Sequence, residues 1–139
     1  MRKTIVLGLL ATAAVFAAAE AQVVPFKGTL SGASEVPPVQ SQGSGAAAVN
    51  ANPATKGVSW SVTYSGLSGP PAAAHIHCGA AAGANAGVAV DLGKNLASPI
   101  QGSGTMTDAQ MADLQAGKCY VNIHTANNKG GELRGQLAK

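Results

Sequence analysis

The sequence predicts an all-β fold, a Greek-key β-sandwich of about eight strands with one short helix. Short runs of alternating apolar and polar residues, the pattern of half-buried strands, recur along the chain and are separated by Gly, Pro, Asn and Ser. The apolar spacing of an amphipathic helix is nearly absent. The 139 residues suit one domain and show no internal repeat.

The segment 58–65 is the clearest strand. Its even-numbered residues are Val, Trp, Val and Tyr, and its odd-numbered residues are Ser and Thr, so one face is apolar and the other polar. By the same reasoning we expect seven further strands: Phe26–Ser31, Ser44–Ala51, Ala73–Cys78, Gly87–Leu92, Ile100–Met106, Lys118–His124 and Glu132–Ala138.

Turn residues join these strands. Asn52–Lys56 reads as a hairpin turn, and Asn127–Gly131 as the turn before the last strand. The proline pairs at 37–38 and 70–71 cannot lie in central strands, so they mark loops.

One helix is expected shortly after Thr107. Thr107 can cap it, with Gln110 three residues on as the partner of a capping box, and Gly117 suits its end. Met111 and Leu114 would bury on one side of it.

The N-terminus has the pattern of a secretory signal peptide. Arg2 and Lys3 precede an apolar run, and Ala19-Glu20-Ala21 is a small-x-small cleavage site. The run is shorter than the ~20 residues that cross a bilayer. We therefore expect residues 1–21 to be removed and residues 22–139 to form a periplasmic or secreted domain with no membrane span.

The composition excludes several classes of function. Nine Lys and Arg against six Asp and Glu are too sparse for a nucleic-acid surface, and one Trp, two Tyr and two Phe offer no stacking platform. The chain has no paired carboxylates, nucleophile elbow or phosphate loop. The sequence therefore predicts a binding or structural protein and not an enzyme.

Strand parity separates the His residues from the Cys residues. Alternate side chains of a strand point to opposite faces, so His75 and His77 share one face while Cys78 lies with the apolar residues on the other. In the later strand Cys119 falls on the apolar face and His124 on the opposite one. Both Cys therefore point to the core, and all three His point away from it.

The two cysteines are predicted to form a disulfide. An exported protein with an even number of Cys usually pairs them, which favours a Cys78–Cys119 bond. The alternative is two buried thiols that pack as small apolar side chains.

The three histidines form a candidate metal site. Two imidazoles of a His-x-His strand lie about 7 Å apart along the backbone, and a third from a neighbouring strand would complete a nitrogen-rich site for copper or zinc. The alternative is three polar side chains that only form hydrogen bonds. Cys78 as an additional copper ligand would require the strand alternation to break.

Four motifs resemble the CHRD (chordin) domain family. They are Leu30–Val39 (LSGASEVPPV), Ala74–His77 (AHIH), Tyr120–Thr125 (YVNIHT) and Gly131–Leu137 (GELRGQL), and they occur in the order of that family. The resemblance covers nearly the whole chain after the signal peptide and implies an exported β-domain. The family motif also suggests a structural charge pair between Glu35 and Arg134, whereas on parity alone Glu132 and Arg134 are expected to form an exposed pair.

A weaker likeness is to copper/zinc superoxide dismutase. By position His75, His77 and His124 match three of its copper ligands, which favours copper. The segment 79–86 contains no His or Asp, so the bridging His and the zinc ligands of that family are missing. We therefore expect an exported copper-binding protein, with an unidentified extracytoplasmic protein as a second partner. The alternative is a structural or adhesive extracellular module without metal.

Overall fold

Eight strands and one α-helix follow one another along residues 22–139, the part of the chain that the computed structural model describes. The strands are β1 (Val24–Ser31), β2 (Ser44–Asn52), β3 (Gly57–Ser65), β4 (Pro71–Cys78), β5 (Val88–Asp91), β6 (Ile100–Thr105), β7 (Cys119–Thr125) and β8 (Leu133–Gln136). A 3-10 turn, η1 (Gly32–Ser34), follows β1, and the helix is α1 (Asp108–Gln115). The all-β prediction is confirmed. The predicted signal peptide, residues 1–21, lies outside the described residues.

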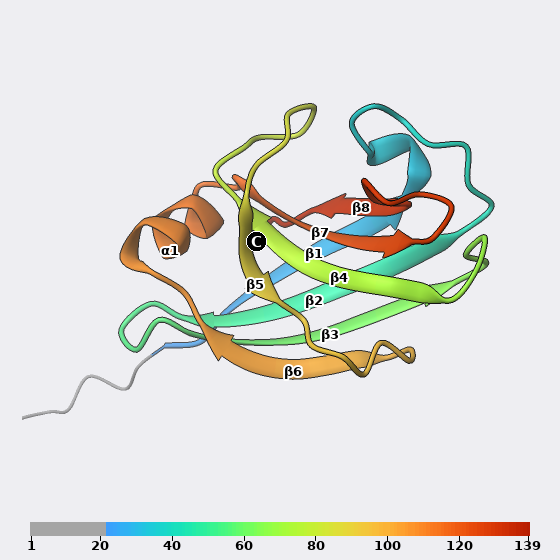
Figure 1. The fold of residues 1–139 in the computed structure, drawn as a ribbon. Helices are drawn as coiled ribbons and strands as arrows, with labels where there is room; N and C mark the ends of the chain where they lie inside the picture. Colours follow the sequence, from blue (N-terminus) through green and yellow to red (C-terminus); the bar gives the residue numbers. More distant parts are fainter. Residues whose placement is uncertain (1–21) are drawn as a thin grey trace, which may run out of the picture.

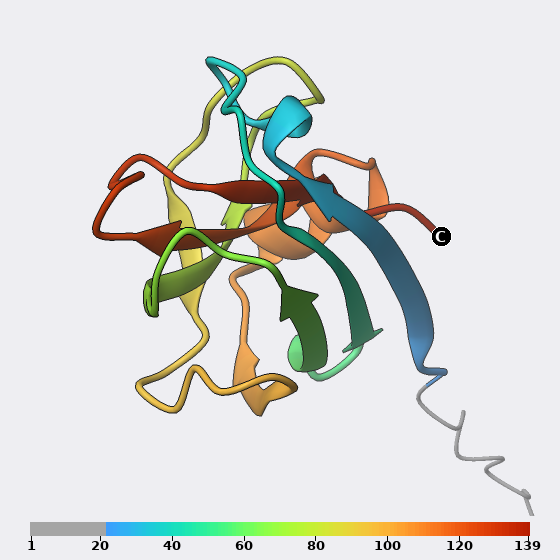
Figure 2. The same cartoon turned by 90° about the vertical axis from the view of Figure 1, so that its right-hand side faces the viewer.

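The strands form one antiparallel sheet in the order β5-β4-β7-β8-β1-β2-β3-β6. Its two halves, β5-β4-β7-β8 and β1-β2-β3-β6, face each other and give the all-β sandwich or nearly closed barrel seen in Figure 1 and Figure 2. The chain crosses between the halves from β3 to β4, from β5 to β6 and from β6 to β7. These crossings bring β4 and β7, distant in sequence, side by side.

The hydrophobic core lies between the two halves of the sheet. It consists of the apolar residues that alternation along the strands places on the inner face. On β3 Val58, Trp60 and Val62 are buried, while Ser59 and Thr63 point to solvent. The strands β7 and β8 are an exception, because most of their residues are buried on both faces. Loops cover the outer side of these two strands, and the candidate site lies there.

The helix forms as its cap predicts. The Thr107 hydroxyl accepts from the Gln110 backbone N–H, and the Gln110 side chain accepts from the Thr107 N–H, at 3.2 and 2.9 Å. Met111 and Leu114 pack into the core. Among residues 22–139 no helix is long and apolar enough to span a membrane.

One loop prediction is wrong in detail. Pro71 begins β4 and pairs with Thr125 instead of lying in a loop. A shift of register between Pro71 and Ala73 explains the exception, because a proline is tolerated at the first residue of a strand and beside a bulge.

The cysteines are joined, as predicted. Cys78 and Cys119 face each other at the ends of β4 and β7 and form a disulfide across 41 residues of sequence. The bond fits a protein of an oxidising compartment. It also removes Cys78 from the list of metal ligands.

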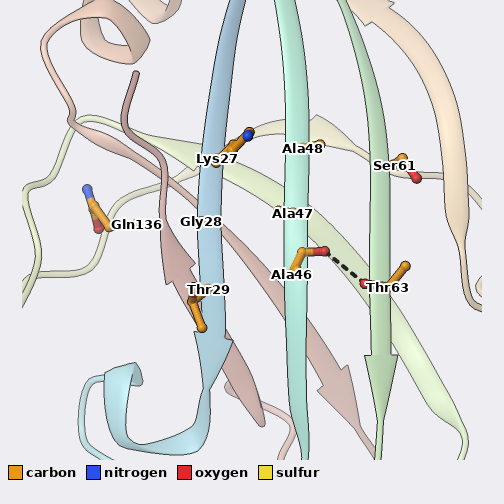
Figure 3. A pocket seen from close by; sticks show the side chains of 9 residues that line it. All are labelled: Lys27, Gly28, Thr29, Ala46, Ala47, Ala48, Ser61, Thr63 and Gln136. Carbon is orange, nitrogen blue, oxygen red and sulfur yellow. Dashed lines mark hydrogen bonds between the residues drawn. The ribbon is translucent and has the colours of Figure 1, made fainter.

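The outer face of β1, β2 and β3 carries mostly small side chains. Ala46 and Ala48 of β2 lie between Thr29 of β1 and Ser61 and Thr63 of β3 in a shallow groove (Figure 3). The Thr63 hydroxyl donates to the Ala46 carbonyl there, at 3.5 Å. None of the three histidines lines this groove, because they lie on β4 and β7 in the other half of the sheet.

Candidate metal centre

The three histidines meet on the outer face of β4 and β7. In the register of these strands His77 lies opposite Tyr120 and His75 lies opposite Asn122. One residue pair separates these two pairs, so they point to the same face of the sheet, and His124 lies near the end of β7. One ring nitrogen from each histidine lies within 4.8 Å of the others. The predicted residues are therefore brought together, close enough for their nitrogens to share one metal ion.

Backbone carbonyls fix the ring protons of two histidines. His124 Nδ1 lies 2.9 Å from the Lys129 carbonyl, and His77 Nδ1 lies 2.9 Å from the Ala86 carbonyl. A carbonyl oxygen only accepts, so both Nδ1 atoms carry a proton and the neutral rings keep a lone pair on Nε2. Hydrogen bonds of this kind orient the imidazoles of metal sites.

His75 joins the other two through a direct contact. Its Nδ1 lies 3.1 Å from His124 Nε2, which has the lone pair and accepts the bond. Burial lowers the pKa of His75, and the neighbouring His124 and His77 lower it further, while Asp91 opposes the change. The neutral ring is the form of histidine that binds metal ions.

Aromatic stacking holds His77 from its other side. The Tyr120 ring is parallel to the His77 ring at 4.8 Å between centroids, and the Arg134 guanidinium lies 3.5 Å from the centre of the Tyr120 ring. His77 is 9% exposed, whereas His75 and His124 are half-buried. One side of the histidine cluster is therefore rigid and the other is open to solvent.

The loop between β4 and β5 is fastened over this stack. Arg134 donates to the Ala84 carbonyl at 2.7 Å and to the Asn85 side chain at 3.1 Å. The Tyr120 hydroxyl accepts from the Ala86 N–H at 3.1 Å. Arg134 and Tyr120 thus set the position of the Ala86 carbonyl, which in turn orients His77. Sequence reasoning missed this role, although both residues belong to motifs that the family resemblance singles out.

The predicted charge pair of Glu35 and Arg134 is not a direct ion pair. Among residues 22–139 the one ion pair within 4 Å joins Lys56 to Asp108, and Arg134 instead bonds to the loop that covers it. Glu35 is 5% exposed, and its Oε1 has no hydrogen-bond partner. Burial raises the pKa of Glu35 to about 7, although the charge of Arg134 and the Asn122 amide favour the ionised form.

This burial predicts how stability depends on pH. The pKa of Glu35 rises from 4.5 when unfolded to about 7 when folded, so wild type loses stability as pH rises from about 4.5 to 7. Glu35→Gln resembles the protonated carboxyl and removes this loss. We therefore compare the free energy of unfolding of Glu35→Gln with that of wild type, measured with urea. The variant minus wild-type difference is expected to be on the order of 1–2 kcal/mol larger at pH 8 than at pH 4.5. Parallel profiles for the two proteins would contradict the assignment.

Glu132 was expected to be exposed and is fully buried. Its carboxylate accepts hydrogen bonds from three hydroxyls, one backbone N–H and one amide, donated by Ser41, Ser68, Thr125 and Asn128. Arg134 is 1% exposed, so the expectation of an exposed pair is wrong for both residues. Parity gave the correct face, but the loops that cover this face leave no periodic signal in the sequence.

A family model for the CHRD domain matches residues 26–137. The chain belongs to the CHRD domain family. The match confirms the resemblance seen in the four motifs and identifies the chain as an extracellular type of module. Searches of curated proteins and of solved structures found no significant match. The histidine cluster of this CHRD domain, with the stack and the loop around it, therefore has to be interpreted from its own geometry.

Proposed function

We propose that this CHRD-domain protein binds a copper ion outside the cytoplasm through His75, His77 and His124. The observation that carries the proposal is the meeting of all three histidines on one face, with one nitrogen of each within 4.8 Å of the others. Imidazole nitrogens suit copper and zinc, and copper(II) is bound more strongly than zinc by the same ligands.

The ligand atoms follow from the hydrogen bonds. Nε2 of His124 and Nε2 of His77 keep the lone pairs that their backbone partners leave them. His75 Nδ1 donates its proton to His124 Nε2 in the metal-free protein, so a metal ion bound by both nitrogens would have to replace that proton. The half-buried side of the cluster leaves room for a water molecule or a group of a partner protein. A copper ion bound there would supply a one-electron redox centre.

The proposed role is binding and not catalysis. The loop over the site, residues 79–86, contains no His or Asp, so it supplies none of the further imidazole or carboxylate ligands of the superoxide dismutase pattern. The disulfide and the predicted signal peptide support a periplasmic or secreted location. A protein in that location would bind copper outside the cytoplasm.

A copper titration tests the proposal. Wild type is expected to bind one Cu(II) with a dissociation constant below about 1 μM and to show nitrogen hyperfine structure in electron paramagnetic resonance. His124→Ala removes one ligand and is expected to bind at least about tenfold more weakly with a changed spectrum, because one imidazole fewer contributes to the affinity. Gln101→Ala, on the other half of the sheet, is the control. Binding by wild type weaker than about 1 μM would contradict the proposal and favour the structural module.

A further inference from the structure

Asn122 lies among the three histidines. In the register of β4 and β7 it is opposite His75, and on β7 it precedes His124 by two residues, so its side chain shares their face of the sheet. Its side-chain oxygen, Oδ1, lies 3.1 Å from His77 Nε2. One amide that is 3% exposed therefore neighbours all three rings.

The contact between Asn122 and His77 joins two atoms that only accept hydrogen bonds. The Ala86 carbonyl holds the proton of the neutral His77 ring on Nδ1, so Nε2 has a lone pair and no hydrogen. The amide oxygen of Asn122 also has lone pairs and no hydrogen. Two buried acceptors that face each other at 3.1 Å are unfavourable unless a positively charged or donating group completes the contact.

The other end of the amide fixes this orientation. Asn122 favours the ionised form of the Glu35 carboxyl, which it can do only through its NH₂ group, because an ionised carboxylate only accepts. Both groups lie beside Gly131, where a Cβ atom would be 2.6 Å from Asn122 Nδ2 and closer still to Glu35 Oε1. The NH₂ group therefore faces Glu35, and Oδ1 is directed at His77.

The distance between the two acceptors suits two ligands of one metal ion. Nitrogen and oxygen ligands lie about 2 Å from such an ion, so neighbouring ligands in its coordination shell are about 3 Å apart. His77 Nε2 and Asn122 Oδ1 have this separation. His75 Nδ1 and His124 Nε2 are also 3.1 Å apart, but a proton lies between them in the metal-free protein. The pair of His77 and Asn122 can bind a cation without first losing a proton.

We propose that Asn122 Oδ1 is a fourth ligand of the metal ion, so that the site offers three imidazole nitrogens and one amide oxygen. This assignment rests on the proposed function and adds a ligand from the middle of the cluster. Glu35 holds the NH₂ end of the amide, as carboxylates hold the ligands of other metal sites. An amide oxygen is a harder ligand than imidazole, so Asn122 stabilises copper(II) more than copper(I).

Asn122→Leu tests the proposal with Cu(II) and Cu(I) as separate probes. Leucine branches at Cγ as asparagine does and has no ligand atom. The variant is expected to bind Cu(II) about tenfold more weakly than wild type, with a changed electron paramagnetic resonance spectrum, and to bind Cu(I) less than about threefold more weakly. Asn50→Leu, the same change at an exposed position of β2, is the matched control and is expected to bind both ions as wild type does. An unchanged Cu(II) affinity, or equal losses for the two ions, would overturn the proposal.

A second measurement uses wild type and does not depend on whether the variant folds. Zinc(II) is diamagnetic and takes nitrogen and oxygen ligands, so its binding can be followed by nuclear magnetic resonance. Coordination through Oδ1 withdraws electrons from the amide, so the side-chain ¹³C and ¹⁵N signals of Asn122 are expected to move together with the histidine ring signals. The side-chain signals of Asn85, which bonds to Arg134, serve as the reference and are expected to move less. Histidine signals that move while those of Asn122 stay in place would contradict the assignment.

The two proposals fail in different ways. If His124→Ala weakens copper binding and Asn122→Leu does not, the proposed function stands and Asn122 is not a ligand. If wild type binds no copper, the three-histidine site and its fourth ligand are both wrong.

Discussion

Replacing Cys78 and Cys119 together by alanine is expected to lower the free energy of unfolding by about 4 kcal/mol. The disulfide closes a loop of 41 residues, and in the chain-entropy model the stabilisation comes from the restricted unfolded chain. A domain of this size has roughly 5–15 kcal/mol of stability in total, so the loss is a large part of it. Urea unfolding of the double variant and of wild type gives the difference directly.

The reduced wild type is the matched control for this experiment. Reduction opens the same loop without changing the sequence, so reduced wild type and the double variant are expected to agree. A loss below about 1 kcal/mol in both would contradict the entropic account. The bond also lies next to the site, because Cys78 follows His77 and Cys119 precedes Tyr120. We expect copper affinity to fall together with stability in the double variant.

Glu132→Gln is expected to destabilise the domain by about 2–3 kcal/mol at pH 7. A glutamine offers one oxygen and one NH₂ where the carboxylate offers two oxygens, so its NH₂ meets the donors of Ser68 or Asn128 instead of accepting from them. Urea unfolding at pH 7 measures the effect. Asp113→Asn on α1, outside this network, is the control and is expected to change stability little.

The same variant has a characteristic dependence on pH. Burial opposes the ionisation of Glu132, but the hydrogen bonds from Ser68, Thr125 and Ser41 outweigh it and lower its pKa from 4.5 to about 2. A carboxyl with a lowered pKa contributes stability above pH 4.5, and this contribution is lost as pH falls towards 2. The difference between wild type and Glu132→Gln is therefore expected to shrink in acid. A constant difference from pH 7 to pH 3 would show that ionisation is not the cause.

Alternation along the strands was sufficient to predict most of the fold. Each of the eight strands lies where the pattern expected it, with ends shifted by at most two residues, and the capping box located α1. Parity also separated Cys78 and Cys119 from the histidines, because a strand has only two faces and the apolar residues mark the inner one. These results depend on local sequence alone.

The contacts made by loops could not be predicted in this way. Parity placed Glu132 and Arg134 correctly on the outer face, but it contains no information on what lies above that face. Ser41 and Ser68 reach Glu132 from 91 and 64 residues away, and no spacing rule connects them. The position of Asn122 against His77 was missed for the same reason. The meeting of the three histidines was predictable from parity, and the residues that surround them were not.

Glu35, Glu132 and Arg134 are buried, so they do not contribute to the charged groups on the surface of the domain. The other Lys, Arg, Asp and Glu residues within 22–139 are six lysines and three aspartates: Lys27, Lys56, Lys94, Lys118, Lys129, Lys139, Asp91, Asp108 and Asp113. Lysines thus outnumber aspartates on the exterior, while the interior holds two carboxyls and one guanidinium. A divalent cation approaches against this positive field. Added salt screens the repulsion over distances of about 10 Å, so the rate at which the proposed site binds a metal ion is expected to depend on ionic strength.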